Sequence, residues 1–252
     1  MRSLRSHIPN IITALNLFFG CLSIAWASHE HFGIASIFIF IAAILDFLDG
    51  LAARVLEAYS PIGAQLDSLA DMISFGLAPA FLVFSNVFLL SSVSGQHQGL
   101  LSLGLFSGII LVLPFILSVF AGLRLAKFNI DDRQKENFIG LPTPAMALFF
   151  ASAVYTFQST DLIFFHNLMN SILFWNGFAV LFSFLMISEI KMIALKFKNL
   201  RWADNQFQYL FIGISVILLV SLHAISLPLI ILWYVLLSFV YHIYNFKKTM
   251  SL

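Results

Sequence analysis

Charged residues are scarce in this sequence, and their scarcity excludes an ordinary soluble protein. Asp, Glu, Lys and Arg make up only 10% of the 252 residues, whereas 60% are hydrophobic, above the roughly 45–50% of soluble domains. The net charge is +1 and the basic residues form short scattered clusters, so the footprint of a nucleic-acid-binding protein is missing. A single cysteine, Cys21, excludes an intramolecular disulfide. With a mean hydropathy of +0.96, the sequence is typical of an integral membrane protein.

Long apolar runs are abundant. Runs of about 20 hydrophobic residues recur along the chain, a length that crosses a bilayer as a helix, whereas barrel strands would alternate polar and apolar residues. We therefore predict an all-α, polytopic membrane protein with about eight transmembrane helices. The expected spans lie near residues 8–28, 33–55, 61–90, 100–126, 142–159, 171–196, 207–222 and 225–246.

The first apolar run has two interpretations. Ala25-Trp26-Ala27 resembles the cleavage site of a secretory signal. The polar residues Thr13 and Asn16 lie within the run, however, and no soluble domain follows it. A retained first span is therefore favoured.

All 13 Lys and Arg residues fall on one side of these spans. They precede the first span, follow the second, flank the loop after the fourth, and follow the sixth and the eighth. The opposite loops contain no Lys or Arg. Because cytoplasmic loops carry the excess of positive charge, we predict that both termini are cytoplasmic and that the protein lies in the inner (cytoplasmic) membrane of a prokaryote.

Four of the aspartates lie close together between residues 46 and 71. Asp46 pairs with Asp49, and Asp67 pairs with Asp71; spacings of three and four residues put each pair on one helix face. Two facing helices would bring four carboxylates to one point near the cytoplasmic face, where they would repel one another unless a cation lay between them. An all-oxygen set without Cys or His favours Mg²⁺, Mn²⁺ or Ca²⁺. Taken alone, the aspartates could instead line an ion or proton pathway in a transporter, or form ion pairs between helices.

The same stretch contains a longer pattern. It reads Asp46-x2-Asp49-Gly50-x2-Ala53-Arg54-x8-Gly63-x3-Asp67-x3-Asp71, which resembles the defining motif of the CDP-alcohol phosphotransferase family at every position, spacers included. A CDP-linked lipid carries a diphosphate, whose charge carboxylate-bound metal ions can neutralise. Arg54 can grip a phosphate with two donors. Gly50 and Gly63 lack side chains where a nucleotide must approach the backbone.

The resemblance also implies a role for each motif residue. Asp46, Asp49 and Asp67 would ligate two divalent cations, Mg²⁺ or Mn²⁺, with Ca²⁺ as an alternative. Asp71 would lie near the second ion and act as the general base for the acceptor alcohol. The residues implied for the CDP-diacylglycerol site are Gly50, Ala53, Arg54 and Gly63. Family members are commonly homodimers, so a homodimer is expected.

Three further segments resemble the phosphatidylserine synthase branch of this family: residues 74–80 (SFGLAPA), 123–129 (LRLAKFN) and 140–145 (GLPTPA). That branch transfers a phosphatidyl group from CDP-diacylglycerol to L-serine and releases CMP, so these are the implied substrates. The opening Ile8-Pro9-Asn10-x2-Thr13-x2-Asn16 is similar as well. Asn10 and Thr13 would contact the nucleotide lipid, although both equally suit a capped helix start. The nearest alternative is another acceptor, such as glycerol 3-phosphate, an inositol phosphate or choline.

A polar cluster near the end of the fourth span is a candidate acceptor pocket. Arg124 and Lys127 could bind the carboxylate of serine or a lipid phosphate, and Asn129 could receive an ammonium or hydroxyl group. The alternative for the basic pair is ordinary anchoring among lipid headgroups.

The resemblance covers roughly the first 150 residues well and thins beyond them. We therefore predict a six-helix catalytic core at residues 1–200. Residues 201–252 are expected to form a two-helix membrane extension.

Overall fold

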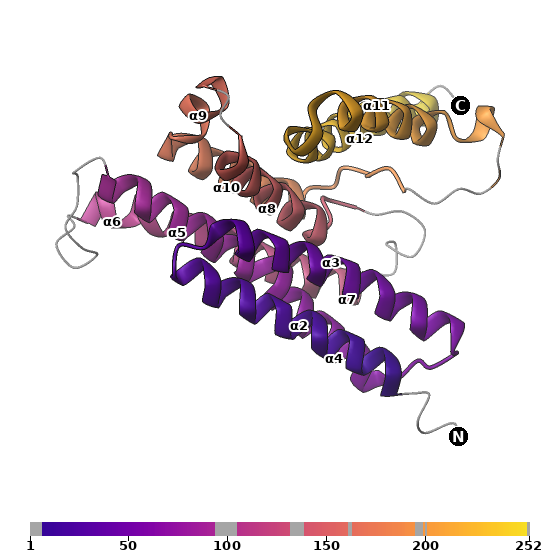
Figure 1. The fold of residues 1–252 in the computed structure, drawn as a ribbon. Coiled ribbons are helices and arrows are strands. Elements are labelled where there is room, and N and C mark those ends of the chain that lie inside the picture. Colours follow the sequence, from indigo (N-terminus) through magenta and orange to yellow (C-terminus); the bar gives the residue numbers. More distant parts are fainter. Residues whose placement is uncertain are drawn as a thin grey trace.

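The computed structural model describes residues 7–93, 105–131, 139–160, 163–194, 199 and 201–250. Within these ranges every regular element is a helix (Figure 1), and the one β pairing is a single bridge between Ile139 and Lys191. The prediction of an all-α protein is confirmed.

The first two helices form a closely packed hairpin (Figure 1). α2 spans His7–Ser28 and α3 spans Phe32–Val55. Ser23 of α2 is buried and its Oγ donates a hydrogen bond to the carbonyl of Ala35 at 2.9 Å. Small side chains of this kind let membrane helices approach closely. The hairpin sets the start of α2 beside the end of α3, where the first pair of aspartates lies.

The third span is not one regular helix. α4 spans Pro61–Asp71, a π-helix covers Met72–Leu77, and α5 spans Ala78–Val93. The sequence predicts an uninterrupted span here and gives no sign of the π-turn, whose i→i+5 bonding takes in extra residues per turn. The N–H of Ala78 accordingly donates to the carbonyl of Ile73.

Neighbouring hydroxyl groups hold this π-turn in place. Ser74 Oγ donates to the carbonyl of Asn16 in α2 at 3.0 Å. Ser118 Oγ donates to the carbonyl of Gly76 at 3.1 Å. Both serines are buried, so the π-turn is fixed against two neighbouring helices.

The helices in the middle of the chain form much of the buried interior of the protein. α6 (Leu105–Val112) continues through a 3₁₀ turn (Leu113–Phe115) into α7 (Ile116–Ile130). α8 (Thr143–Ser159) and α10 (Ile172–Ile187) flank a short α9 (Ile163–Met169). α8 is the most buried of these helices and contacts α3, α5 and α12. Residues 100–104 of the predicted fourth span lie outside the described residues.

The predicted sixth span, 171–196, is too long. α10 ends at Ile187, and Ser188 has extended backbone angles. The chain turns extended because its next residues pair with the segment before α8: the N–H of Gly140 donates to the carbonyl of Ile190 at 2.9 Å. Residues 195 and 196 lie outside the described residues.

The last two helices pack against each other. α11 (Gln206–Leu222) is preceded by a 3₁₀ turn at Trp202–Asp204 and followed by another at His223–Ile225, after which α12 spans Ser226–Met250. His223 has a positive φ of 50°, and it directly follows the predicted span 207–222. Figure 1 shows the pair on the side of the molecule away from α2 and α4, joined to the core through α12 and α8.

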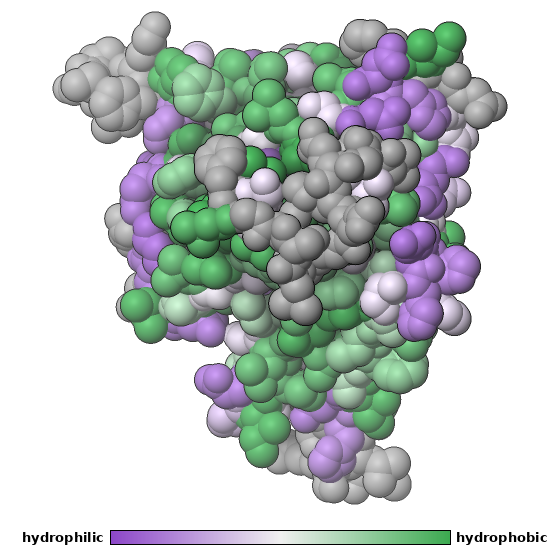
Figure 2. All heavy atoms as spheres, turned by 90° about the vertical axis from the view of Figure 1, so that its left-hand side faces the viewer, coloured by the Kyte–Doolittle hydropathy of each residue, from purple (hydrophilic) through white to green (hydrophobic). Residues whose placement is uncertain are grey.

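The surface matches a bilayer environment. Five helical stretches are long and apolar enough to cross a membrane: His7–Ser28, Phe32–Val55, Pro61–Ser92, Ser107–Ile130 and Gln206–Tyr244, the last of which contains both α11 and α12. α8 and α10, with 17 and 16 residues, are shorter. Every residue of α11 is at least partly exposed although the helix is apolar, and hydrophobic residues dominate the coloured surface in Figure 2. Such a surface suits lipid rather than water, and the chain is an integral membrane protein.

Candidate active site

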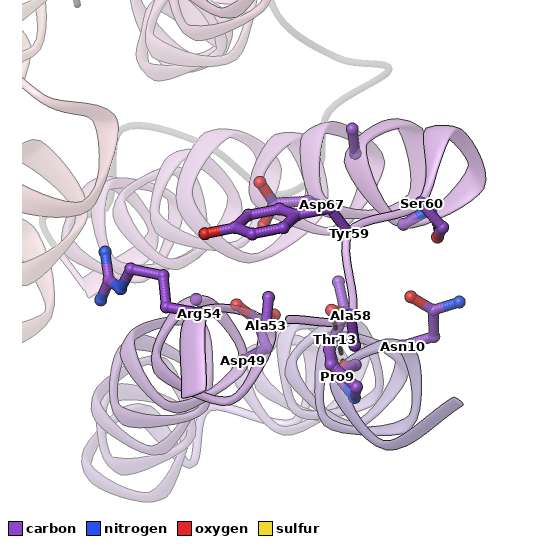
Figure 3. A pocket seen from close by; sticks show the side chains of 13 residues that line it. Pro9, Asn10, Thr13, Asp49, Ala53, Arg54, Ala58, Tyr59, Ser60 and Asp67 are labelled. Atoms are coloured by element: carbon purple, nitrogen blue, oxygen red, sulfur yellow. Dashed lines mark hydrogen bonds between the residues drawn. The ribbon is translucent and has the colours of Figure 1, made fainter. Parts of the chain in front are cut away.

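A pocket of about 290 Å³ opens where α2, α3 and α4 meet (Figure 3). α2 and α3 contribute one side, and α4 with the turn before it contributes the other. The lining residues are Pro9, Asn10, Thr13, Asp49, Gly50, Ala53, Arg54, Ala58, Tyr59, Ser60, Gly63, Ala64 and Asp67. The six residues that the sequence predicts for the nucleotide lipid are all among them: Asn10, Thr13, Gly50, Ala53, Arg54 and Gly63.

The four predicted carboxylates gather at the inner end of this pocket. Ligand oxygens of Asp46, Asp49 and Asp67 all lie within 4.8 Å of one another. Asp71 is one turn beyond Asp67 on α4 and lies beside Asp46. The two-pair spacing therefore predicted the convergence of α3 and α4 correctly.

The start of α4 is shaped by its cap. Ser60 is the N-cap, and its Oγ accepts a hydrogen bond from the N–H of Gly63 at 2.9 Å; Pro61 at the first helical position is preset for the helix. A Cβ on Gly63 would lie 2.7 Å from Asn10 Oδ1 and 2.9 Å from Ser60 Oγ. A larger residue at this position would therefore have to displace the Asn10 or Ser60 side chain. A Cβ on Gly50, by contrast, would meet nothing within 4 Å, so that backbone faces the open pocket.

The comparisons with known proteins agree with the motif. A family model described as CDP-alcohol phosphatidyltransferase matches residues 6–187. The chain belongs to this family. A Helicobacter pylori (strain J99) protein named CDP-diacylglycerol–serine O-phosphatidyltransferase is 31% identical over 221 residues, which cover 86% of this chain and 84% of the relative. Proteins of the same name are 36% identical over 186 residues in Bacillus subtilis (74% and 89% covered) and 34% identical over 184 residues in Methanocaldococcus jannaschii (73% and 72% covered).

The carboxylate cluster of this family member is suited to a divalent cation. Asp49 is only 6% exposed, and within the described residues Asp49 Oδ2 and Asp71 Oδ1 have no hydrogen-bond partner. Buried, unpartnered carboxylate oxygens are costly unless a cation or donor satisfies them. Opposite ligands of one Mg²⁺ lie about 4 Å apart, close to the spread of these oxygens. The donor set is all oxygen, which suits Mg²⁺, Mn²⁺ or Ca²⁺.

The three residues predicted for an acceptor pocket are all on α7 but contact different elements. Arg124 is 6% exposed and lies within electrostatic range of Asp71 and of Tyr234 in α12. Lys127 forms an ion pair with Glu189, 2.7 Å from Nζ to Oε1. The Nδ2 of Asn129 donates to Ser68 Oγ at 3.1 Å. Arg124 is thus the member of the trio that faces the carboxylates.

Sequence reasoning missed several pocket residues, and Tyr59 is the most prominent. In Figure 3 its ring extends across the pocket from the Ser60 side toward Arg54, and 74% of the residue is exposed. It belongs to the short connection between α3 and α4, where no helical period marks which side chains turn inward. The only available signal was an aromatic residue inside the motif's eight-residue spacer.

Proposed function

We propose that this chain transfers the phosphatidyl group of CDP-diacylglycerol to L-serine, releasing CMP. In this reaction the serine hydroxyl oxygen bonds to the phosphorus that carries diacylglycerol. The bond from that phosphorus to the bridging diphosphate oxygen breaks, CMP leaves, and the hydroxyl proton passes to a base. The observation that carries the proposal is the pocket itself, where all six predicted nucleotide-lipid residues open directly onto the carboxylate cluster. The activity for which these relatives are named favours serine among the possible acceptors.

In this proposal the four aspartates bind metal, and one of them also acts as the general base. Asp46, Asp49 and Asp67 hold two divalent cations, Mg²⁺ or Mn²⁺, with Asp71 at the second. When bound, such ions neutralise the diphosphate and the negative charge that develops on phosphorus. Asp71 accepts the proton of the serine hydroxyl, since it is the carboxylate that lies within electrostatic range of Arg124.

The other pocket residues bind the lipid's headgroup. Arg54, exposed in the last turn of α3, is free to hold a phosphate through two parallel N–H donors. On the α3 side of the pocket, Gly50 and Ala53 carry no bulky side chain, and Asn10 and Thr13 line the α2 side. These contacts explain why the motif alternates acidic residues with very small ones.

Arg124 is the residue we assign to the carboxylate of serine. It is a buried cation whose Nε has no hydrogen-bond partner among the described residues, so a bound carboxylate would satisfy it. Lys127, which is held by Glu189, and Asn129, which is held by Ser68, would border the acceptor pocket rather than reach into it.

The membrane orientation follows from the basic residues. The end of α3, the end of α7, the segment after α10 and the end of α12 carry described basic residues, and hydrogen bonds or ion pairs link α7 and α12 to that segment. We propose that this end is cytoplasmic, in the inner membrane of a prokaryote, with the pocket and both termini there. Six of the basic residues lie outside the described residues: Arg2, Arg5, Arg133, Lys135, Lys196 and Lys198. The division into a core at 1–200 and an extension at 201–252, and a homodimer, stay predictions.

The deciding experiment is CMP release from CDP-diacylglycerol by the purified protein in detergent with Mn²⁺ or Mg²⁺. We expect CMP only when L-serine and metal are both present. CMP with glycerol 3-phosphate, an inositol phosphate or choline instead would keep the chemistry and reject serine. If no acceptor gives CMP while the protein carries ions across a vesicle membrane, the transporter interpretation of the aspartates is correct and the proposal is wrong.

A further inference from the structure

The segment after α10 is not helical, and part of it is buried among helices. Residues 188–194, here called the strap, include Met192 and Ile193, which are 1% and 2% exposed. Backbone N–H and C=O groups that are shielded from water must find partners within the protein. On one side of the strap, the carbonyl of Ile190 accepts from the N–H of Gly140. The backbone groups on its other side need hydrogen-bond partners as well.

Three side chains of α12 satisfy that other side. Tyr234 Oη donates to the carbonyl of Ile193 at 3.1 Å, and Ser238 Oγ accepts from the N–H of Ile193 at 3.2 Å. His242 Nδ1 accepts from the N–H of Lys191 at 3.1 Å. We call Tyr234, Ser238 and His242 the α12 ladder.

The α12 ladder fits the strap because bonding groups are spaced by nearly the same distance on the helix and on the extended chain. Residues four apart share one helix face and are separated by about 6 Å along the axis. Two residues of an extended strand advance about 6.6 Å. The distance along α12 from Ser238 to His242 is therefore close to the distance along the strap from Ile193 to Lys191. One face of α12 thus hydrogen-bonds the strap as a neighbouring strand would. Tyr234 and Ser238 are 8% and 0% exposed, so their two bonds to Ile193 are buried.

The strap and the ladder both meet the acceptor side of the site. Glu189 at the start of the strap pairs with Lys127 of α7, one turn after Arg124. Tyr234 itself lies within electrostatic range of Arg124, which in turn faces Asp71. The phenol that bonds the strap thus also borders the buried cation.

We propose that the α12 ladder is a positioning device for the acceptor half of the active site. By holding the strap, it fixes the end of α7 and orients the Arg124 guanidinium toward Asp71. Tyr234, Ser238 and His242 all lie beyond residue 187, where the match to the family model ends. In this proposal α12 thus contributes to serine binding from outside the matched range. This inference rests on the proposed function, because it assigns Arg124 to the acceptor.

The test compares Tyr234→Phe with Tyr244→Phe. Both remove one phenolic oxygen from α12, but Tyr244 is 57% exposed and its ring contact with Phe207 survives in phenylalanine. For Tyr234→Phe we expect KM for L-serine to rise about three- to tenfold, the range of one lost hydrogen bond, with KM for CDP-diacylglycerol within about twofold. Tyr244→Phe keeps both values.

A second measurement reports the accessibility of the strap and does not depend on enzyme activity. In a Cys21→Ser background, the alkylation rate of Ile193→Cys reports how often the strap opens. We expect Tyr234→Phe and Ser238→Ala to raise this rate and Tyr244→Phe to leave it unchanged. An unchanged serine KM in Tyr234→Phe would overturn the inference, as would equal rises in both substrate KM values. If the parent protein uses another acceptor, the proposed function is wrong but the inference can still be tested. The KM for that acceptor in Tyr234→Phe then takes the place of the KM for L-serine.

Discussion

Ser74 donates a hydrogen bond to the backbone carbonyl of Asn16, joining residues 58 apart in the chain at 3.0 Å. The bond locks the π-turn after Asp71 onto α2, the helix that carries Asn10 and Thr13 of the pocket. A Cβ on Gly20 would come within 2.9 Å of Ser74 Cα, so the two backbones approach as closely as glycine permits. Asp71 is therefore anchored from the C-terminal side, at the point where α4 ends.

Replacing Asp71 with asparagine should stop turnover without preventing substrate binding. Asparagine has nearly the same shape but cannot take the proton of the serine hydroxyl, so we expect CMP release to fall about 10²- to 10⁴-fold. CDP-diacylglycerol should still bind in the presence of Mn²⁺. The matched control is Asp204→Asn in the turn before α11, which should keep full activity. Activity of Asp71→Asn near that of the parent would remove the assignment as base.

Asp46→Asn should weaken the metal site. It removes one charged oxygen from the cluster of three, and we expect the dissociation constant for Mn²⁺ to rise at least about tenfold, with a matching loss of metal-dependent CDP-diacylglycerol binding. Titration of Mn²⁺ followed by electron paramagnetic resonance measures the first effect directly. Unchanged Mn²⁺ affinity would place Asp46 outside the metal shell.

Two glycine-to-alanine changes should separate folding from binding. Gly63→Ala forces Asn10 or Ser60 to move, and we expect it to destabilise the protein by about 1–3 kcal/mol, as overpacking does. Gly50→Ala meets no protein atom and should fold normally, while its methyl group narrows the pocket and raises KM for CDP-diacylglycerol. Thermal unfolding in detergent and steady-state kinetics distinguish the two. Equal losses of stability would contradict the packing described here.

Tyr59 should contribute to nucleotide binding through its ring. An exposed aromatic side chain across a nucleotide-sized pocket offers a stacking surface for the cytosine base, worth about 1–3 kcal/mol. Tyr59→Ala should therefore raise KM for CDP-diacylglycerol about tenfold, whereas Tyr59→Phe should stay within about twofold of the parent. Competitive inhibition by free CDP provides an independent measure. Similar values for the alanine and phenylalanine variants would exclude stacking.

The sequence predicted the carboxylate cluster because helical period is a local rule. Asp46 and Asp49 had to share a face once α3 was a helix, and the same holds for Asp67 and Asp71 on α4. The long apolar runs likewise predicted where helices would occur. Their convergence then required only a short connection between α3 and α4.

The parts that sequence reasoning missed depend on contacts between distant segments. The chain from Ser188 to Ala194 is apolar enough to continue α10. Its non-helical form depends on α12 side chains that lie 41 to 51 residues later in the sequence. Tyr59 turns into the pocket because of how the connection packs, which no periodicity encodes. Arg124, Lys127 and Asn129 looked like one cluster. Asn129 is two residues from Lys127 and so faces another way. Arg124 and Lys127 share a face, but Lys127 forms an ion pair with Glu189.

The π-turn at 72–77 takes one residue more per turn than an α-helix. Deleting one residue there would therefore let an α-helix run through while α4 and α5 keep their relative rotation, so Asp67 and Asp71 would still face α3. Such a deletion would instead disturb the bond from Ser74 to Asn16. A one-residue deletion in α5 outside the turn would rotate the rest of that helix by about 100°. Among related chains, a one-residue gap within the turn is therefore compatible with a working site.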